Sequence, residues 1–276
     1  MMIASGSIHA VVNAIVKGRR STGTGSRLSL MAGRAAVDGA SAALLLPAAL
    51  LVPPPHGAWG WLGLSAAVHV VYLYAMIRAY AAADFSAAYP VLRGTAPLLT
   101  ALVTIGLLGE RVAPTALAGI ALIGAAMLLL VWGRHLSGSA LGWSVLTGGM
   151  TALYTVADAH GVRAAPSVAS YIVWDFVLIG SLSVVMFAGL SRGAVLPAMR
   201  AQWRPGAIAG ALSIVTYGLA LAALALGPTA PLAALRETGM VTALVLATLF
   251  LGEAVTGRRM LAVAGILAGA ALILLG

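Results

Sequence analysis

The stretch LRGTAPLLTALVTIGLLGERVAPT, residues 92–115, returns in related form as LRETGMVTALVLATLFLGEAVTGR, residues 235–258. The residues that recur at one spacing, 143 positions as between 93 and 236, are Arg93 and Arg236, Thr95 and Thr238, Gly109 and Gly252, Glu110 and Glu253, Gly18 and Gly161, and Tyr74 and Tyr217. Charged and aromatic residues are scarce in this chain, so these matches carry more weight than matching leucines. The repeat indicates a gene-duplicated protein with two homologous halves.

The composition selects a membrane as the solvent. Of the 276 residues, 61% are hydrophobic and 8% charged, and the mean hydropathy is +1.03. Soluble domains are about a quarter charged, so this chain lacks the polar residues to cover a soluble globule. The net charge of +9 lies mostly in gaps between apolar runs, which argues against nucleic acid as a partner. The chain has no cysteine, and its first residues predict no cleaved signal peptide.

The apolar runs predict an all-α integral membrane protein, because each is close to the roughly 20 residues that span a bilayer. Polar, glycine-rich or proline-rich gaps separate them. The ten expected spans are 2–17, 29–52, 58–82, 85–109, 113–133, 141–160, 167–190, 206–227, 229–252 and 257–275. The spacings Gly206-xxx-Gly210 and Gly265-xxx-Gly269 predict close helix contacts, since small residues let helices approach in lipid.

Five spans per half is an odd number, so the two halves are expected to lie in the membrane with opposite orientations. The basic residues agree with this arrangement. Loops after odd spans hold Lys17, Arg19, Arg20, Arg27, Arg134, Arg192, Arg200, Arg204, Arg258 and Arg259. Loops after even spans hold only Arg111 and Arg163. By the positive-inside rule, the odd loops face the cytoplasm and both termini face outward.

The ends of spans 4 and 9, LLGERV (107–112) and FLGEAV (250–255), resemble the drug/metabolite transporter superfamily. With the AGI segments at 118–120 and 264–266, they are similar to its EamA-like permeases, which have ten spans in two inverted five-helix repeats. The resemblance covers essentially the whole chain, with repeats at 1–133 and 141–276. The segment YPVLRGTAPLL (89–99) is similar to a branch associated with phosphonate utilisation.

The resemblance implies a secondary transporter that moves a small metabolite through a cavity between the halves, with export as a common direction. The expected partners are a small-molecule substrate, the lipid bilayer of the cell (inner) membrane and a second copy in a homodimer. No enzyme activity, cofactor, metal site or nucleic-acid partner is expected. Two alternatives stay open: a flippase of a lipid-linked substrate, and an intramembrane enzyme. The enzyme is disfavoured because no HExxH, GxSxG or close His/Asp cluster occurs.

Arginine side chains inside spans are the strongest site candidates, because an ionisable group in a bilayer is costly and usually functional. Arg93 and Arg236 lie well inside spans 4 and 9, and inverted copies bring both toward the midplane. Two guanidinium groups suit a carboxylate, phosphonate or phosphate. The alternative is internal pairing, for example of Arg236 with Asp175.

Other polar residues within the spans complete the predicted site. The further substrate-binding candidates are Asn13, His69, Tyr72, Tyr154, Trp174 and Tyr217. The proton-coupling candidates are Asp175, Asp158 and Glu237. Pro97 and Pro231 are expected to break the cavity helices. Tyr171, near a span end, is expected to be an interfacial anchor.

Glu110 and Glu253 stand directly before spans 5 and 10. A carboxylate is stabilised by the unsatisfied amide hydrogens at a helix N-terminus. Both are therefore interpreted as structural caps of the helices that follow them.

Overall fold

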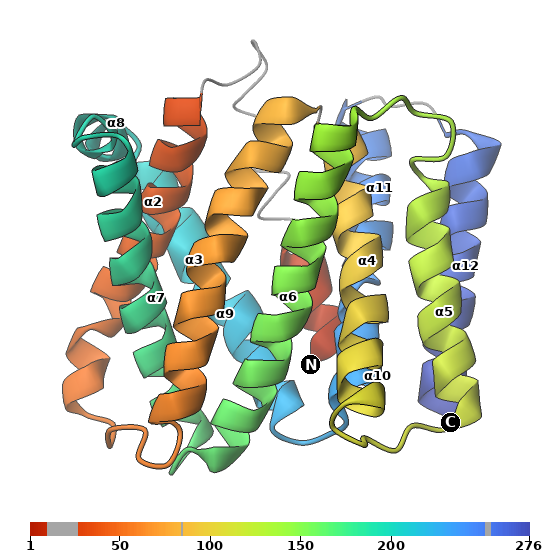
Figure 1. The fold of residues 1–276 in the computed structure, drawn as a ribbon, viewed down its shortest axis with the longest axis horizontal. Coiled ribbons are helices and arrows are strands. Elements are labelled where there is room, and N and C mark those ends of the chain that lie inside the picture. The colour runs from red at the N-terminus through yellow and green to blue at the C-terminus, as the bar shows by residue number, and fades with distance from the viewer. Residues whose placement is uncertain (10–26, 84, 252–254) are drawn as a thin grey trace.

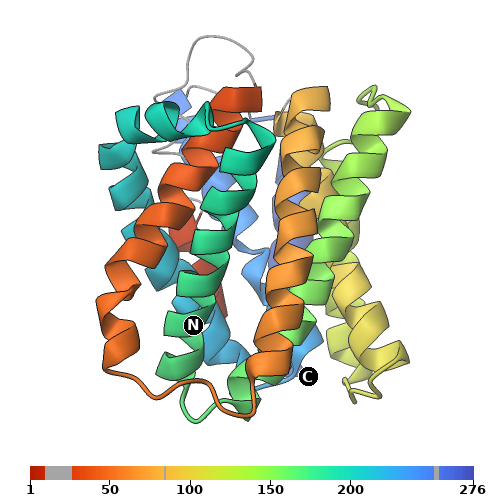
Figure 2. The ribbon, with the colours of Figure 1, turned by 60° about the vertical axis from the view of Figure 1, so that its left-hand side comes forward.

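The computed structural model describes residues 1–9, 27–83, 85–251 and 255–276, and within these ranges it contains helices and no strands (Figure 1). The helices stand side by side, as a second view also shows (Figure 2). Residues 2–9 are helical. The elements that follow are α2 (Arg27–Leu45), the 3₁₀ helix η1 (Pro47–Leu50), α3 (Trp59–Ala82), α4 (Phe85–Gly106), α5 (Pro114–Leu129), α6 (Gly138–Ala164), α7 (Val168–Leu190), α8 (Val195–Ala201), α9 (Trp203–Leu224), α10 (Thr229–Arg236), α11 (Gly239–Leu251) and α12 (Gly257–Leu275). The predicted all-α class is confirmed.

Six helical segments of the described ranges are long and apolar enough to cross a membrane. They are Arg27–Leu50, Trp59–Ala82, Ala87–Gly106, Val168–Leu190, Trp203–Leu224 and Gly257–Leu275. α5 is apolar but has only 16 residues. α6 has 27 residues, but it carries three ionisable side chains near its end: Asp158, His160 and Arg163. The segments support a multi-pass membrane protein, while the count of ten spans is not confirmed.

Two predicted segments differ from the structure. The ninth span is two helices, α10 and α11, which are separated at residues 237 and 238. The gap between spans 7 and 8 was expected to be a loop, yet it contains α8. Ser191 Oγ accepts a hydrogen bond from the amide of Val195 at 3.0 Å, and Pro197 lies in the first turn of α8, where no amide hydrogen is needed.

Glycines allow the close helix contacts that hold the bundle together. Gly206 and Gly210 of α9 lie against the backbone of α2, and neither leaves room there for a Cβ atom. In α12, Gly265 lies against the Ala126 side chain of α5 and Gly269 against the α5 backbone at Gly119. Both predicted glycine pairs therefore serve helix packing, which in lipid depends on close van der Waals contact.

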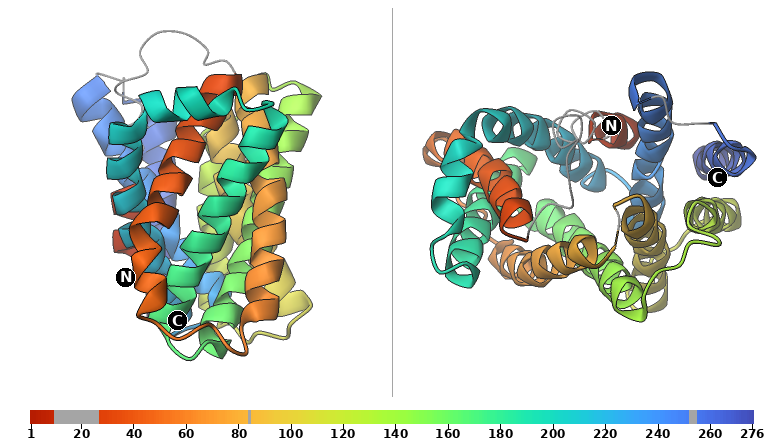
Figure 3. Two further views of the ribbon diagram at one scale, coloured as in Figure 1. Left: turned by 90° about the vertical axis from the view of Figure 1, so that its left-hand side faces the viewer. Right: turned by 90° about the horizontal axis from the view of Figure 1, so that it is seen from above.

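Helices that correspond in the two predicted halves run in opposite directions. α4 descends in Figure 1, whereas α10 and α11 ascend, and α5 and α12 form an antiparallel pair at one edge. Across the halves, α3 packs on α6 and α2 packs on α7. Figure 3, seen from above, shows the helices surrounding an interior to which α4, α6, α9 and α10 all contribute.

Candidate functional site

Arg93 and Arg236 line one cavity between α4, α6, α9 and α10. Its volume is about 20 Å³, which is room for about one water molecule. A metabolite therefore enters only after this central cavity has widened. The residues around it are Met2, Arg93, Ala96, Pro97, Thr100, Thr151, Thr155, Tyr217, Ala220, Leu224, Ala233, Arg236 and Glu237.

Arg93 forms an ion pair across the two predicted halves. Its Nε lies 2.8 Å from Oε2 of Glu237, and both residues are buried, with 8% and 3% of their surface exposed. The guanidinium also lies over the ring of Tyr89, 5.7 Å from its centroid. Removing two charges from water is costly unless they meet, so this pair ties α4 to the junction of α10 and α11.

The junction between α10 and α11 places Glu237 at the cavity. Around it the backbone bonds tighten from the α-helical to the 3₁₀ pattern, with the amide of Glu237 donating to Ala234 and that of Thr238 to Leu235. The next residue, Gly239, lies directly against the backbone of Gly6, where no Cβ atom would fit. Short 3₁₀ segments inside a span are typical of hinges.

Arg236 has no carboxylate partner among the described residues. Its guanidinium lies over the ring of Tyr217, 5.1 Å from the centroid, and its buried Nε has no hydrogen-bond acceptor within the described ranges. The alternative of internal pairing holds for Arg93, which pairs with Glu237, whereas Arg236 Nε and Asp175 Oδ1 each lack a hydrogen-bond partner among the described residues. Two guanidinium groups and one carboxylate thus line the cavity, which leaves one formal positive charge in excess.

Asp158 is held by two tyrosines behind the central cavity. The hydroxyl of Tyr171 donates to its Oδ1 at 2.9 Å, and that of Tyr217 donates to its Oδ2. Tyr171 is completely buried, so its prediction as an interfacial anchor is wrong. Its ring packs against Gly161 of α6, which leaves no room there for a Cβ atom. Arg236, Tyr217 and Asp158 consequently form one connected chain of polar groups.

The remaining aromatic candidates lie beside this chain. His69 and Tyr154 stack with ring centroids 4.0 Å apart, and Tyr72 meets both rings edge-on. His69 Nδ1 lies 3.0 Å from the carbonyl oxygen of Ser65, one turn earlier in α3, so this contact is within the helix and the stacking on Tyr154 is the one that joins α3 to α6. Trp174 contacts Trp59 edge-on, 5.5 Å between centroids. Asp175 is buried, and its Oδ1 has no hydrogen-bond partner among the described residues.

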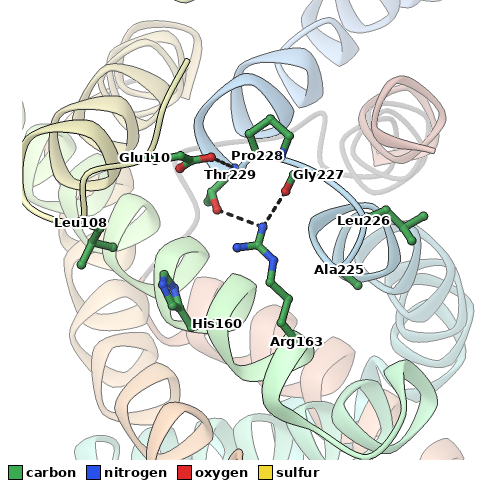
Figure 4. Close-up of a pocket in the computed structure, with 9 residues that line it drawn as sticks. All are labelled: Leu108, Glu110, His160, Arg163, Ala225, Leu226, Gly227, Pro228 and Thr229. Atoms are coloured by element: carbon green, nitrogen blue, oxygen red, sulfur yellow. Dashed lines mark hydrogen bonds between the residues drawn. The ribbon is translucent and has the colours of Figure 1, made fainter. Parts of the chain in front are cut away.

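A larger cavity of about 400 Å³ lies at the end of the bundle where α6 and α9 finish (Figure 4). Its lining comprises Leu108, Glu110, His160, Arg163, Ala225, Leu226, Gly227, Pro228 and Thr229. Glu110 Oε1 accepts a hydrogen bond from the amide of Thr229, the first residue of α10. Glu110 was expected to cap α5, and it caps a helix of the other half instead. We name this space the outer cavity.

The sequence model of the EamA-like transporter family matches residues 138–275, half of the chain. The chain belongs to the EamA-like transporter family. Membership agrees with the resemblance inferred from the LGE segments and makes the chain a membrane transporter of the drug/metabolite type. The match does not test the phosphonate-associated branch, which stays a prediction.

Solved structures support the fold of this EamA-like chain. One crystal structure of a protein aligns with 99% of this chain over 96% of its own length, at a TM-score of 0.69 and 20% identity. Such a likeness shows a shared fold and carries no substrate. No curated protein matches the sequence.

The prolines predicted to break the cavity helices of this EamA-like transporter do not do so, and other predicted residues lie outside the described residues. α4 continues through Pro97, and Pro231 lies in the first turn of α10, so the interruption comes at neither proline. Asn13 and Glu253 lie outside the described residues. No group of three potential metal ligands occurs within the described ranges.

One buried polar cluster was not singled out from the sequence. Arg34 Nε donates to Asp38 Oδ2 at 2.8 Å, and Ser183 Oγ donates to the same oxygen at 2.7 Å, which joins α2 to α7. The i, i+4 spacing of Arg34 and Asp38 inside an apolar run was the available signal. The partner of Arg93 was also missed, although Glu237 was named for proton coupling.

Proposed function

We propose that this EamA-like transporter exports a small anionic or zwitterionic metabolite across the cell (inner) membrane by alternating access. The substrate's acidic group would bind between Arg93 and Arg236 in the central cavity. The two halves would act as inverted repeats that rock about this site. The central cavity would then open to one side of the membrane and afterwards to the other.

The observation that carries this proposal is the excess positive charge of the central cavity. Arg93 is paired with Glu237, whereas the guanidinium of Arg236 lies over the ring of Tyr217 and its Nε has no hydrogen-bond acceptor among the described residues. Inserting a guanidinium without a carboxylate partner into a bilayer costs free energy, so such a residue usually marks a functional site. A carboxylate or phosphonate supplies the acceptor that Arg236 lacks and can bind it through two parallel hydrogen bonds.

The orientation proposed for the halves rests on helix direction and charge. Corresponding helices run oppositely in Figure 1, as two inverted five-helix repeats require. The basic residues that follow α5, α7 and α8, and those that open α2 and α12, gather at one end of the bundle. By the positive-inside rule this end would face the cytoplasm, and the outer cavity would face the opposite side.

The proposed proton-coupling residue belongs to the chain of contacts formed by Arg236, Tyr217 and Asp158. Asp158 is our candidate for the coupling carboxylate because Tyr217 links it directly to the ring face on which Arg236 lies. A substrate that moved Arg236 off the ring of Tyr217 would shift this tyrosine. The shift would weaken the hydrogen bond from its hydroxyl to Asp158 Oδ2 and so change the proton affinity of this carboxylate. Asp175, with one buried oxygen unpartnered in the described chain, is the second candidate.

Efflux from proteoliposomes tests the site. Vesicles holding isotope-labelled glutamate, alanine, methylphosphonate, 2-aminoethylphosphonate or choline would be followed by mass spectrometry. We expect efflux of at least one of the acids and none of choline. Arg236→Gln should slow that efflux by roughly 10- to 100-fold, the effect of losing a hydrogen bond to a charged group.

Arg204→Gln is the matched control, because Arg204 is exposed and lies over Trp203 outside the cavity. Its efflux should equal that of the unaltered protein. Full activity of Arg236→Gln, or choline efflux as fast as that of the acids, would rule out the assigned site.

A further inference from the structure

The connection between α9 and α10, residues 225–228, separates the central cavity from the outer cavity. The side chain of Leu224 lines the central cavity, whereas its neighbours Ala225, Leu226, Gly227 and Pro228 line the outer one. Any path from the central site to this end of the molecule therefore passes the connection. It is thin, because consecutive residues face the two spaces.

Two charged side chains from other spans hold this connection in place (Figure 4). Arg163, at the end of α6, donates from Nε to the carbonyl oxygen of Leu224 at 2.9 Å and from Nη2 to that of Gly227 at 2.6 Å. The same Nη2 lies 3.3 Å from Thr229 Oγ1. Glu110, which follows α4, binds the amide of Thr229 from the other side.

Glu110 does not cap α5, the helix that follows it in the sequence. Glu110 precedes α5 by only a few residues, yet the N-cap of α5, Ala113, has no side-chain hydrogen bond. The carboxylate instead reaches α10, 119 residues further along the chain. The bond therefore joins α4 of one half to the connection of the other, which is where relative motion of the halves would act.

We propose that Glu110 and Arg163 form a latch that closes the central cavity toward the outer cavity and positions α10. The inference rests on the proposed function of the central site. α10 spans roughly 12 Å, with the latch at its first residue and Arg236 with Glu237 at its other end. The 3₁₀ junction after Arg236 supplies a bend, so releasing the latch lets α10 swing and opens the site.

The latch can open without burying charge. Arg163 is exposed and Glu110 is half-buried beside a cavity of about 400 Å³, so water replaces the broken hydrogen bonds. At the other end of α10, Glu237 is buried and paired with the buried Arg93, so separating these two charges would be costly. The weaker attachment of α10 is thus the one at the outer cavity.

Cysteine labelling tests the latch directly, because the chain contains no cysteine of its own. Thr155→Cys places a thiol on the wall of the central cavity. Its modification by a membrane-impermeant, negatively charged methanethiosulfonate is then measured in vesicles exposing one face or the other. With Glu110→Gln or Arg163→Gln added, labelling from the outer-cavity side should accelerate roughly 10- to 100-fold.

Arg111→Gln is the matched control, since Arg111 is the exposed neighbour of Glu110 and makes no hydrogen bond to the connection among the described residues. It should leave labelling unchanged, and Arg163→Lys should restore most of the closure. Unchanged rates in Glu110→Gln and Arg163→Gln would overturn the latch. Equal acceleration from both faces would also overturn it, because that is the signature of a loosened fold.

The measurement separates the latch from the proposed function. Labelling needs no transported substrate, so one-sided acceleration supports the latch even in a protein that moves none of the tested acids. Loss of efflux in Arg236→Gln with unaltered labelling supports the central site alone.

Discussion

α4 and the pair α10–α11 occupy corresponding places in the two predicted halves and contain the related sequences LRGTAP (92–97) and LRETGM (235–240). α4 is one helix of 22 residues, and it contains both Pro90 and Pro97. The other segment is interrupted after Arg236, at a place with no proline. Helix continuity in this protein therefore does not follow the prolines.

Two of the three substitutions between these hexamers make contacts that differ between the halves. Glu237 stands where α4 has Gly94, and Gly239 stands where α4 has Ala96. Gly94 lets α4 approach Met127 of α5, whereas Glu237 reaches Arg93 in the opposite half. Gly239 allows backbone contact with Gly6. Tertiary contacts thus decide where the span is interrupted, and the interruption follows directly on Arg236, which lines the central cavity.

The largest expected contrast is between the two arginines. Arg93→Gln leaves Glu237 buried without its ion-pair partner and should lower the free energy of unfolding by about 3 kcal/mol, the lower end for a broken buried pair because Arg236 is close by. Arg236→Gln removes a guanidinium that lacks a carboxylate partner in the described chain, so it should change stability by less than about 1 kcal/mol. Thermal unfolding in detergent, followed by tryptophan fluorescence, measures both. Equal losses would show that Arg236 also has a structural partner.

The next contrast concerns the small residues of the two segments. Gly239→Ala forces a methyl group against the backbone of Gly6 and should cost about 2 kcal/mol through overpacking. Ala96→Gly, the reverse exchange at the corresponding place in α4, should cost about 1 kcal/mol through helix propensity alone. Denaturant titration of the purified protein gives both values. A harmless Gly239→Ala would mean that the contact between residues 6 and 239 is not tight.

The smallest contrast uses tyrosines that recur at the repeat spacing. Tyr217→Phe removes a hydroxyl that donates to buried Asp158 and should cost about 1.5 kcal/mol. Tyr74→Phe removes a hydroxyl that accepts from Arg78 on an exposed face and should stay within about 0.5 kcal/mol of the unaltered protein. The same unfolding measurement applies. Similar costs at both positions would argue that the carboxylate of Asp158 does not depend on Tyr217.

Residue types and spacing were enough for the local features. Apolar runs placed α3, α7 and α12 within a residue or two of their observed bounds, because each run ends where polar residues, glycine or proline leave the bilayer. The recurrence of Arg93 at Arg236 also identified two of the residues that line the central cavity. Scarcity made that prediction strong, since a charged residue inside a span has few structural reasons to be there.

Partner choice could not be predicted from such patterns. Glu237 pairs with Arg93 because the junction of α10 and α11 turns it toward α4. Glu110 binds the amide of Thr229 because the end of α4 and the start of α10 lie together in the bundle. Tyr171 resembled an interfacial anchor by position along its helix, yet its neighbours on α6 bury it. Each of these contacts joins residues on different helices, whose relative rotation no linear spacing encodes.

By itself, the amino-acid sequence determined the membrane as solvent, the helical segments, the family and the two arginines, because hydropathy and rare residues act locally and can be read one segment at a time. Only the tertiary structure decided that Arg93, and not Arg236, has an ion-pair partner in the part of the chain that the structure describes, and that Glu110 and Arg163 bind the connection before α10. Those outcomes depend on distances between helices, which close packing sets and which differ between two halves of related sequence.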